Sequence, residues 1–181
     1  MPKYVTDFGD YSVKNIKSFQ GREGYGYNCN LYRNGKKVAF CYDDASGGGM
    51  HPIEWDNAPR TRATDEEWET YRTWRAEEER LLAEHIATLP PAPPDERYPN
   101  LPPLTIDEGL FVEELVNRFE EEKEERKIER QCKTKTLFRL STNREGSYTY
   151  INAPLDTGMR EHLRTKYGNT LVEIINDKFQ S

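Results

Sequence analysis

The chain has 181 residues, of which 35% are hydrophobic and 32% are charged, and its formal net charge is −6. This length suits one domain, or one domain with an insertion, and it is enough to bury a core without disulfide staples. No run of about 18 apolar residues is present, so we expect no membrane-spanning segment. Acidic residues predominate between residues 61 and 130. A general nucleic-acid binder would carry a basic face instead, and we expect no such function.

The first sixty residues are predicted to form an antiparallel sheet. Residues 25–33 alternate between apolar and polar side chains, as a half-buried strand does. Asn34-Gly35 is a strong signal for a two-residue hairpin turn, because both turn positions need positive φ. A second strand over 36–43 then follows, and residues 11–19 are predicted to add a third.

A two-residue loop fixes the expected pairing of this hairpin. Leu31 should face Val38, Cys29 should face Phe40, and Tyr27 should face Tyr42. Their side chains would then share one apolar face, while Cys29 and Cys41 would lie on opposite faces.

The middle of the chain is predicted to be helical. Thr64 and Glu67 form a capping box for a helix over 64–89, and Thr105 with Glu108 suggests a second capping box. Seven prolines between residues 90 and 103 predict an extended, semi-rigid connector between the two helices.

The last fifty residues return to mixed structure. We expect a hairpin around residues 143–146, a short helix from Asp156 to near Gly168, and a final strand or short helix after it. The fold class is therefore α+β, with an N-terminal β region (1–60), a helix and connector (61–106) and a C-terminal α/β region (107–181). We expect these regions to form one composite domain with a shared core.

The segment "CYDDASGGGMHPIEW", from Cys41 to Trp55, is the most probable site. The backbone amides of Gly47, Gly48 and Gly49 could form a concavity that binds an anion or a partner, or the glycines could be a plain connector. The three glycines lack the Lys-Ser/Thr ending of a P-loop.

The side chains around these glycines have two interpretations as well. Asp43, Asp44 and His51 could ligate a divalent cation or supply an acid and a base, and carboxylates also commonly cap turns. Ser46 lies in no nucleophile motif, so we expect no catalytic residue there.

Aromatic and basic residues nearby suggest base stacking and phosphate binding. Pairing places most of the tyrosines in the core, while Tyr32 and Trp55 are expected to be more accessible to stack a base. Arg33 could meet a phosphate.

The cysteines and histidines do not suggest a metal site. Cys29, Cys41 and Cys132 include no CxxC pair, and the three histidines are scattered along the chain. Reduced thiols fit this pattern best, and we expect no cofactor.

The segment "LYRNGKKVAFCYDDASGGG" resembles the N-terminal hairpin of a group of small phage and prophage accessory proteins. The segments "DEGLFVEELVNRFEEEKEERKIERQCKTKTLFRL" and "TLVEIINDK" are similar to later blocks of that group, whereas residues 61–106 are unmatched, which suits an insertion. The group tends to have glycine at the position of Ala45 and histidine at that of Ser46. This departure argues against histidine chemistry at the loop and leaves binding by the backbone in place.

The resemblance implies a phage-encoded, non-catalytic protein that acts in the bacterial host cytoplasm against an anti-phage defence. Its partner would be a nucleotide-type signal that it sequesters, held by the segment from Asp43 to Trp55. Alternatively, the protein would bind a bacterial defence protein directly, like an anti-CRISPR inhibitor. A metal-dependent hydrolase is a third hypothesis. The oligomeric state is not readable from the sequence.

Overall fold

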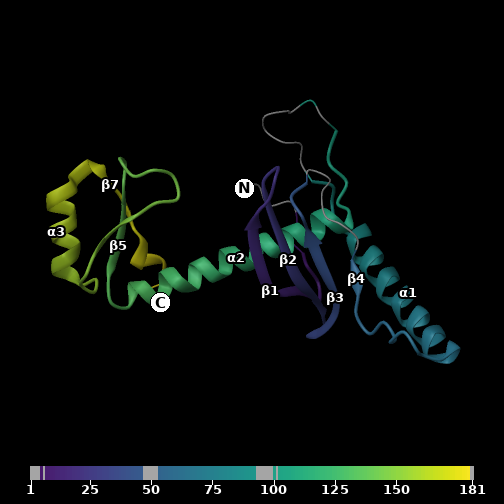
Figure 1. Ribbon diagram of the computed structural model, residues 1–181. Helices are drawn as coiled ribbons and strands as arrows, with labels where there is room; N and C mark the ends of the chain where they lie inside the picture. Colours follow the sequence, from purple (N-terminus) through teal and green to yellow (C-terminus); the bar gives the residue numbers. More distant parts are fainter. Residues whose placement is uncertain (1–4, 6, 47–52, 93–99, 101, 180–181) are drawn as a thin grey trace. The chain divides into compact units, whose positions relative to one another are not determined.

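The computed structural model describes residues 5, 7–46, 53–92, 100 and 102–179 (Figure 1). The fold is α+β, as predicted. The chain divides into two compact units, Met1–Phe119 and Glu120–Ser181, and each has its own sheet and its own cluster of buried side chains. The expectation of one composite domain with a shared core stays a prediction. None of the helices in the described ranges has the length and apolar character needed to cross a bilayer.

A four-stranded antiparallel sheet forms the centre of the first unit. Its strands are β1 (Tyr11–Gln20), β2 (Tyr25–Arg33), β3 (Lys36–Asp43) and the short β4 (Glu54–Trp55), and they lie side by side in chain order (Figure 1). The predicted hairpin and the predicted third strand are confirmed. Asn34 and Gly35 have φ values of +50° and +74°, the backbone that the turn requires.

The pairing of β2 with β3 differs from the predicted pairing because the hairpin contains a bulge. Next to the turn Tyr32 pairs with Lys37, but further along Leu31 pairs with Ala39, which leaves Val38 as an extra residue. All three predicted pairs (Leu31 with Val38, Cys29 with Phe40, Tyr27 with Tyr42) are therefore wrong.

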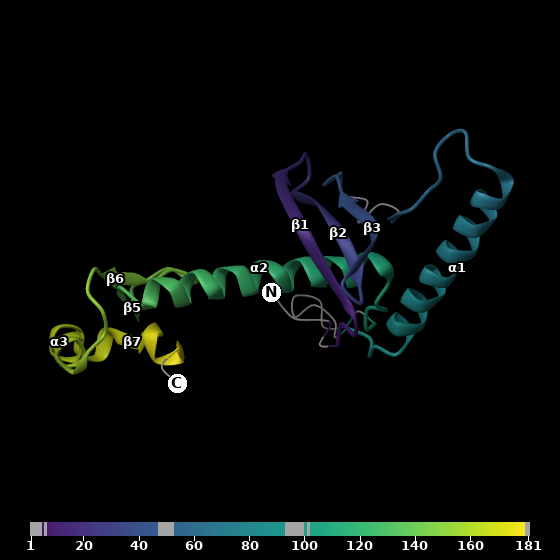
Figure 2. The same cartoon turned by 90° about the horizontal axis from the view of Figure 1, so that it is seen from below.

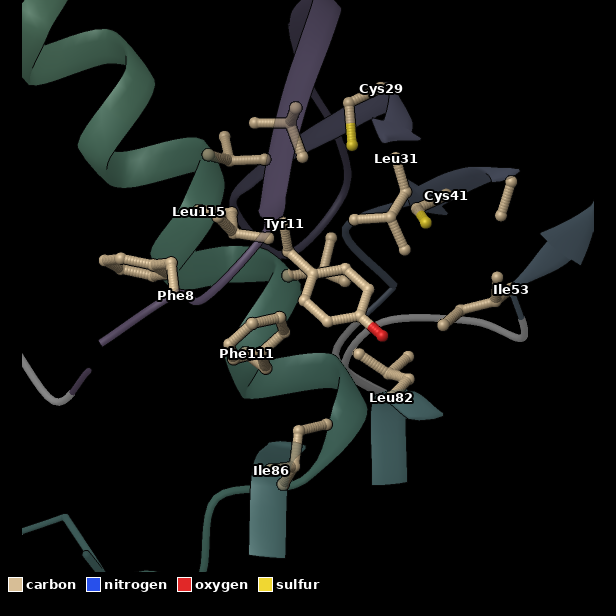
Figure 3. Packing of buried hydrophobic residues seen from close by; sticks show 14 of the residues in the cluster. Phe8, Tyr11, Cys29, Leu31, Cys41, Ile53, Leu82, Ile86, Phe111 and Leu115 are labelled. Atoms are coloured by element: carbon tan, nitrogen blue, oxygen red, sulfur yellow. The ribbon is translucent and has the colours of Figure 1, made fainter. Parts of the chain in front are cut away.

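The bulge reverses the faces of β3 relative to the prediction. Cys29 pairs with Cys41, and Leu31 pairs with Ala39. All four side chains are buried, so the expectation that the two cysteines lie on opposite faces is wrong (Figure 3). Since side chains alternate along a strand, Phe40 must point to the other face of the sheet.

The environment of the three thiols predicts their reactivity. Cys29 and Cys41 are 1% and 0% exposed, and a hydrogen bond with Cys29 together with burial raises the pKa of Cys41. Burial also raises the pKa of Cys132, but this residue is only half-buried. Because the thiolate is the reactive form, we expect only Cys132 to react promptly with a disulfide reagent at pH 8 in the native protein. All three thiols should react in guanidinium. Prompt reaction of all three in the native protein would contradict the pairing of Cys29 with Cys41 in the core.

Two helices contribute side chains to the core on the buried face of this sheet. The first turns of α2 (Glu108–Cys132) run across it (Figure 2) and bury Phe111, Val112 and Leu115. Helix α2 does not begin with the predicted Thr105–Glu108 box. The Asp107 carboxylate instead accepts a hydrogen bond from the Leu110 amide at 2.8 Å, as an N-cap side chain does.

Helix α1 (Asp65–Ala87) begins with the predicted capping box between Thr64 and Glu67. Its buried residues are confined to its second half, where Leu82 and Ile86 join the core. Glu78 docks the helix on the sheet, because its two carboxylate oxygens accept hydrogen bonds from the Arg33 guanidinium, each at 2.7 Å.

The second unit is a small three-stranded sheet with one helix. Strands β5 (Thr136–Leu140), β6 (Thr149–Ile151) and β7 (Leu171–Ile174) have the order β6-β5-β7. Helix α3 (Thr157–Tyr167) lies between β6 and β7 in the chain, and the 3-10 helices η1 (Gly168–Thr170) and η2 (Ile175–Phe179) flank β7. The predicted hairpin is confirmed, and so is the helix that begins after Asp156 and ends at Gly168. The final segment contains both the predicted strand and the predicted short helix.

Candidate ligand-binding face

The glycine loop is the central part of the site proposed from the sequence. Gly47, Gly48, Gly49 and His51 lie outside the described residues. The binding role expected for them therefore stays a prediction.

The residues that lead into the loop form a tight turn. The Asp43 carboxylate accepts a hydrogen bond from the Ala45 amide at 2.7 Å, and the Asp44 carboxylate accepts one from the Ser46 amide at 3.0 Å. Ala45 has a φ of +55° and is buried, and its carbonyl accepts a hydrogen bond from the Glu23 amide. These contacts match the turn-capping interpretation of the two aspartates.

Two other predicted residues are engaged within the protein. Trp55 is 8% exposed and packs edge-on against Trp74 at 6.4 Å, so the expectation that it is accessible for stacking is wrong. The Arg33 guanidinium is held by Glu78. Arg33 also lies at the opposite end of β2 from the partner of Asp43, Tyr27, a distance of roughly 20 Å along an extended strand. Among the described residues of the predicted site, Arg33 therefore lies far from Asp43.

Within the described part of the chain, no three side chains of the His, Cys, Asp or Glu type are placed to hold a metal ion. The hydrolase hypothesis depends on His51 and stays a prediction.

The face of the sheet opposite the core is more polar than the buried face. We call this face, as formed by strands β1, β2 and β3, the outer face. Its side chains are partly or largely exposed, and they are Lys14, Lys17, Phe19, Asn28, Asn30, Tyr32, Phe40 and Tyr42. It combines aromatic rings, amides and lysines.

The register arranges these side chains in rows across the strands. Lys14 pairs with Asn30, which pairs with Phe40, and Lys17 pairs with Asn28, which pairs with Tyr42. Each row therefore contains a lysine, an amide and an aromatic ring. Directly paired residues lie about 5 Å apart, so one row is comparable in length to a nucleotide.

The aromatic rings lie close to one another and to the sheet. The Phe40 and Tyr42 centroids are 6.1 Å apart with an interplanar angle of 31°, and the Lys14 ammonium lies 4.6 Å from the Tyr32 ring centroid. Phe19 packs over Gly26, where a Cβ would approach the ring to 2.7 Å. Glycine is required there for the ring to lie this close to the backbone.

This composition is suited to a ligand with an aromatic ring and an anionic group. Aromatic side chains on a sheet stack nucleobases. Asparagine amides both donate and accept hydrogen bonds and so can contact base edges. Lysines attract phosphate as point charges.

The sequence pattern does not predict this face as a site, although it does predict that Tyr32 is accessible for stacking. Without the bulge, Phe40 and Tyr42 would belong to the core. No local residue marks the bulge in advance, and only the alternative pattern, with Ala39 and Cys41 buried, could have indicated it.

Comparison of the chain with protein-family models, with curated proteins and with solved structures finds no match.

Proposed function

We propose that the chain is a non-catalytic binding protein that holds a nucleotide-type ligand on the outer face. The observation that carries this proposal is the pair of neighbouring rings, Phe40 and Tyr42, aligned in rows with Asn30, Asn28 and the lysines of β1. A base would stack on these rings while its phosphate faces Lys14 and Lys17.

The biological setting of the proposal comes from the resemblance to phage accessory proteins. A phage-encoded protein that binds a nucleotide signal without cleaving it would lower the concentration available to a bacterial defence system. It would act in the host cytoplasm.

The binding experiment is a calorimetric titration with mono-, di- and cyclic nucleotides, each with and without Mg²⁺. Phe40→Ala and Tyr42→Ala should each weaken binding of the tightest nucleotide by about tenfold or more, because base–aromatic stacking contributes about 1–3 kcal/mol per base. Lys14→Gln should weaken binding less and reduce its dependence on salt.

Tyr150→Ala is the matched control, because Tyr150 is a 53% exposed tyrosine in the second unit. It should bind like the unmodified protein. If no nucleotide binds, or if Phe40→Ala and Tyr42→Ala both retain full affinity, the outer face is not the ligand site.

A further inference from the structure

A second group of aromatic side chains joins β4 to the first half of α1. Trp55, Trp74, Tyr71 and Trp68 form a continuous row, with successive ring centroids 6.4, 6.1 and 6.0 Å apart. The end of the row at Trp55 belongs to the core, since Trp55 is buried. Core packing does not explain the other end of the row, because Trp68 is 36% exposed and the buried residues of α1 begin only at Glu78.

A pocket opens beside this row. Its volume is 580 Å³, and its walls include Tyr71, Trp74, Thr70, Glu66, Asn57 and Pro59. The lining therefore combines two aromatic rings and a proline with small polar groups and the carboxylates of Glu66 and Glu67.

The pocket lies in an acidic part of the helix. Residues 65–71 contain Asp65, Glu66, Glu67 and Glu69 and no lysine or arginine. The Glu67 carboxylate is used in the capping box, and Glu69 lies 3.4 Å from Arg72. Glu66 lines the pocket, and among the described residues no lysine or arginine pairs with it.

The next arginines along α1, Arg72 and Arg75, are each paired with a glutamate of the helix. The Arg75 guanidinium donates a hydrogen bond to Glu79 at 2.7 Å. The Glu66 charge and the ring faces of Tyr71 and Trp74 thus remain to attract a cation from outside the helix.

We propose that this pocket binds a lysine or arginine side chain from a basic segment of a partner protein. A cation over an aromatic face gains electrostatic attraction from the ring, and a nearby carboxylate adds to it. Charge complementarity selects this occupant, because an acidic or purely apolar peptide would face the uncompensated Glu66 carboxylate. This interaction is independent of nucleotide binding at the outer face.

The test uses hexa-arginine peptide as the probe and tryptophan fluorescence of the full chain as the readout, at 150 mM salt. Glu66→Gln should weaken binding by about fivefold or more. Glu125→Gln removes the same charge from an exposed position on α2 and should not change the affinity.

The ring itself is tested by a conservative pair of variants. Tyr71→Phe keeps the aromatic face and should retain binding, whereas Tyr71→Leu keeps an apolar side chain without the ring and should lose about fivefold. Thermal melting establishes that each variant is folded. If Tyr71→Leu does not fold, the comparison of Tyr71→Phe with Glu66→Gln still tests the proposal.

Two results would overturn this inference. Equal weakening by Glu66→Gln and Glu125→Gln would mean that the peptide responds only to overall charge. If Glu66→Gln bound the peptide with full affinity, the pocket would not be its binding site. If the unmodified protein bound no peptide, the proposal would also be wrong.

Discussion

Replacing Phe111 with alanine should lower the free energy of unfolding of the first unit by about 4 kcal/mol. Phe111 is fully buried beside Phe8 and Tyr11 (Figure 3). Its ring centroid lies 5.7 Å from that of Tyr11, 5.9 Å from that of Phe8 and 5.5 Å from that of His85. It therefore joins α2 to β1, α1 and the N-terminal segment at one point. Alanine would remove these contacts and leave a cavity that the surrounding elements only partly fill.

Urea denaturation followed by tryptophan fluorescence measures this effect in the first unit alone. The chain has three tryptophans, Trp55, Trp68 and Trp74, and all belong to this unit. Phe19→Ala is the matched control, since Phe19 is 41% exposed, and it should cost about 1 kcal/mol or less. An unfolding midpoint for Phe111→Ala equal to that of the control would contradict the packing of α2 on the sheet.

The second large effect concerns the ion pair that docks α1. Arg33→Met should lower the free energy of unfolding by about 3 kcal/mol, because it leaves the Glu78 carboxylate buried without its partner. The side chains of Arg33 and Glu78 are 24% and 6% exposed, so Glu78 cannot recover its full hydration. The same tryptophan-monitored denaturation measures this loss.

A double-mutant cycle separates the pair from other effects. Arg33→Met combined with Glu78→Leu should recover most of the lost stability, because apolar side chains of similar volume replace a buried pair with little penalty. In contrast, Arg75→Met removes one partner of an exposed pair, with side chains 50% and 41% exposed, and should cost less than about 1 kcal/mol. Strict additivity of the Arg33 and Glu78 changes would show that the two side chains do not interact.

The elements that the sequence predicted correctly are those with local signals. The Asn34-Gly35 turn, the Thr64 capping box and the Asp156-to-Gly168 helix each depend on residues a few positions apart. Such interactions form in the same way in almost any tertiary context, so they can be inferred from a single sequence.

The errors come from interactions between residues that are distant in the chain. The sequence predicts an accessible Trp55, but Trp74 packs against it. Arg33 is bound by Glu78, 45 residues further on. The bulge at Val38 has a similar cause. It places the small residues Ala39 and Cys41 against the core, and that advantage is visible only once the core is assembled.

The same bulge explains why the sequence does not predict the outer face as a site. In the regular hairpin Tyr42 would point into the core. In the structure Phe40 and Tyr42 lie instead on the outer face with Asn28 and Asn30. Asp43 and Asp44, which the sequence suggests as site residues, cap a turn. The rings of Phe40 and Tyr42, which precede them on β3, belong to the candidate face.

The most direct test of the proposed function is to follow backbone amide chemical shifts during titration with the tightest-binding nucleotide. Binding at the outer face predicts that the largest changes fall on residues 28–32 and 40–42 and near Lys14, while amides of β5 to β7 stay unchanged. Changes confined to the second unit, or no change with any nucleotide, would contradict the proposal that the outer face binds a nucleotide.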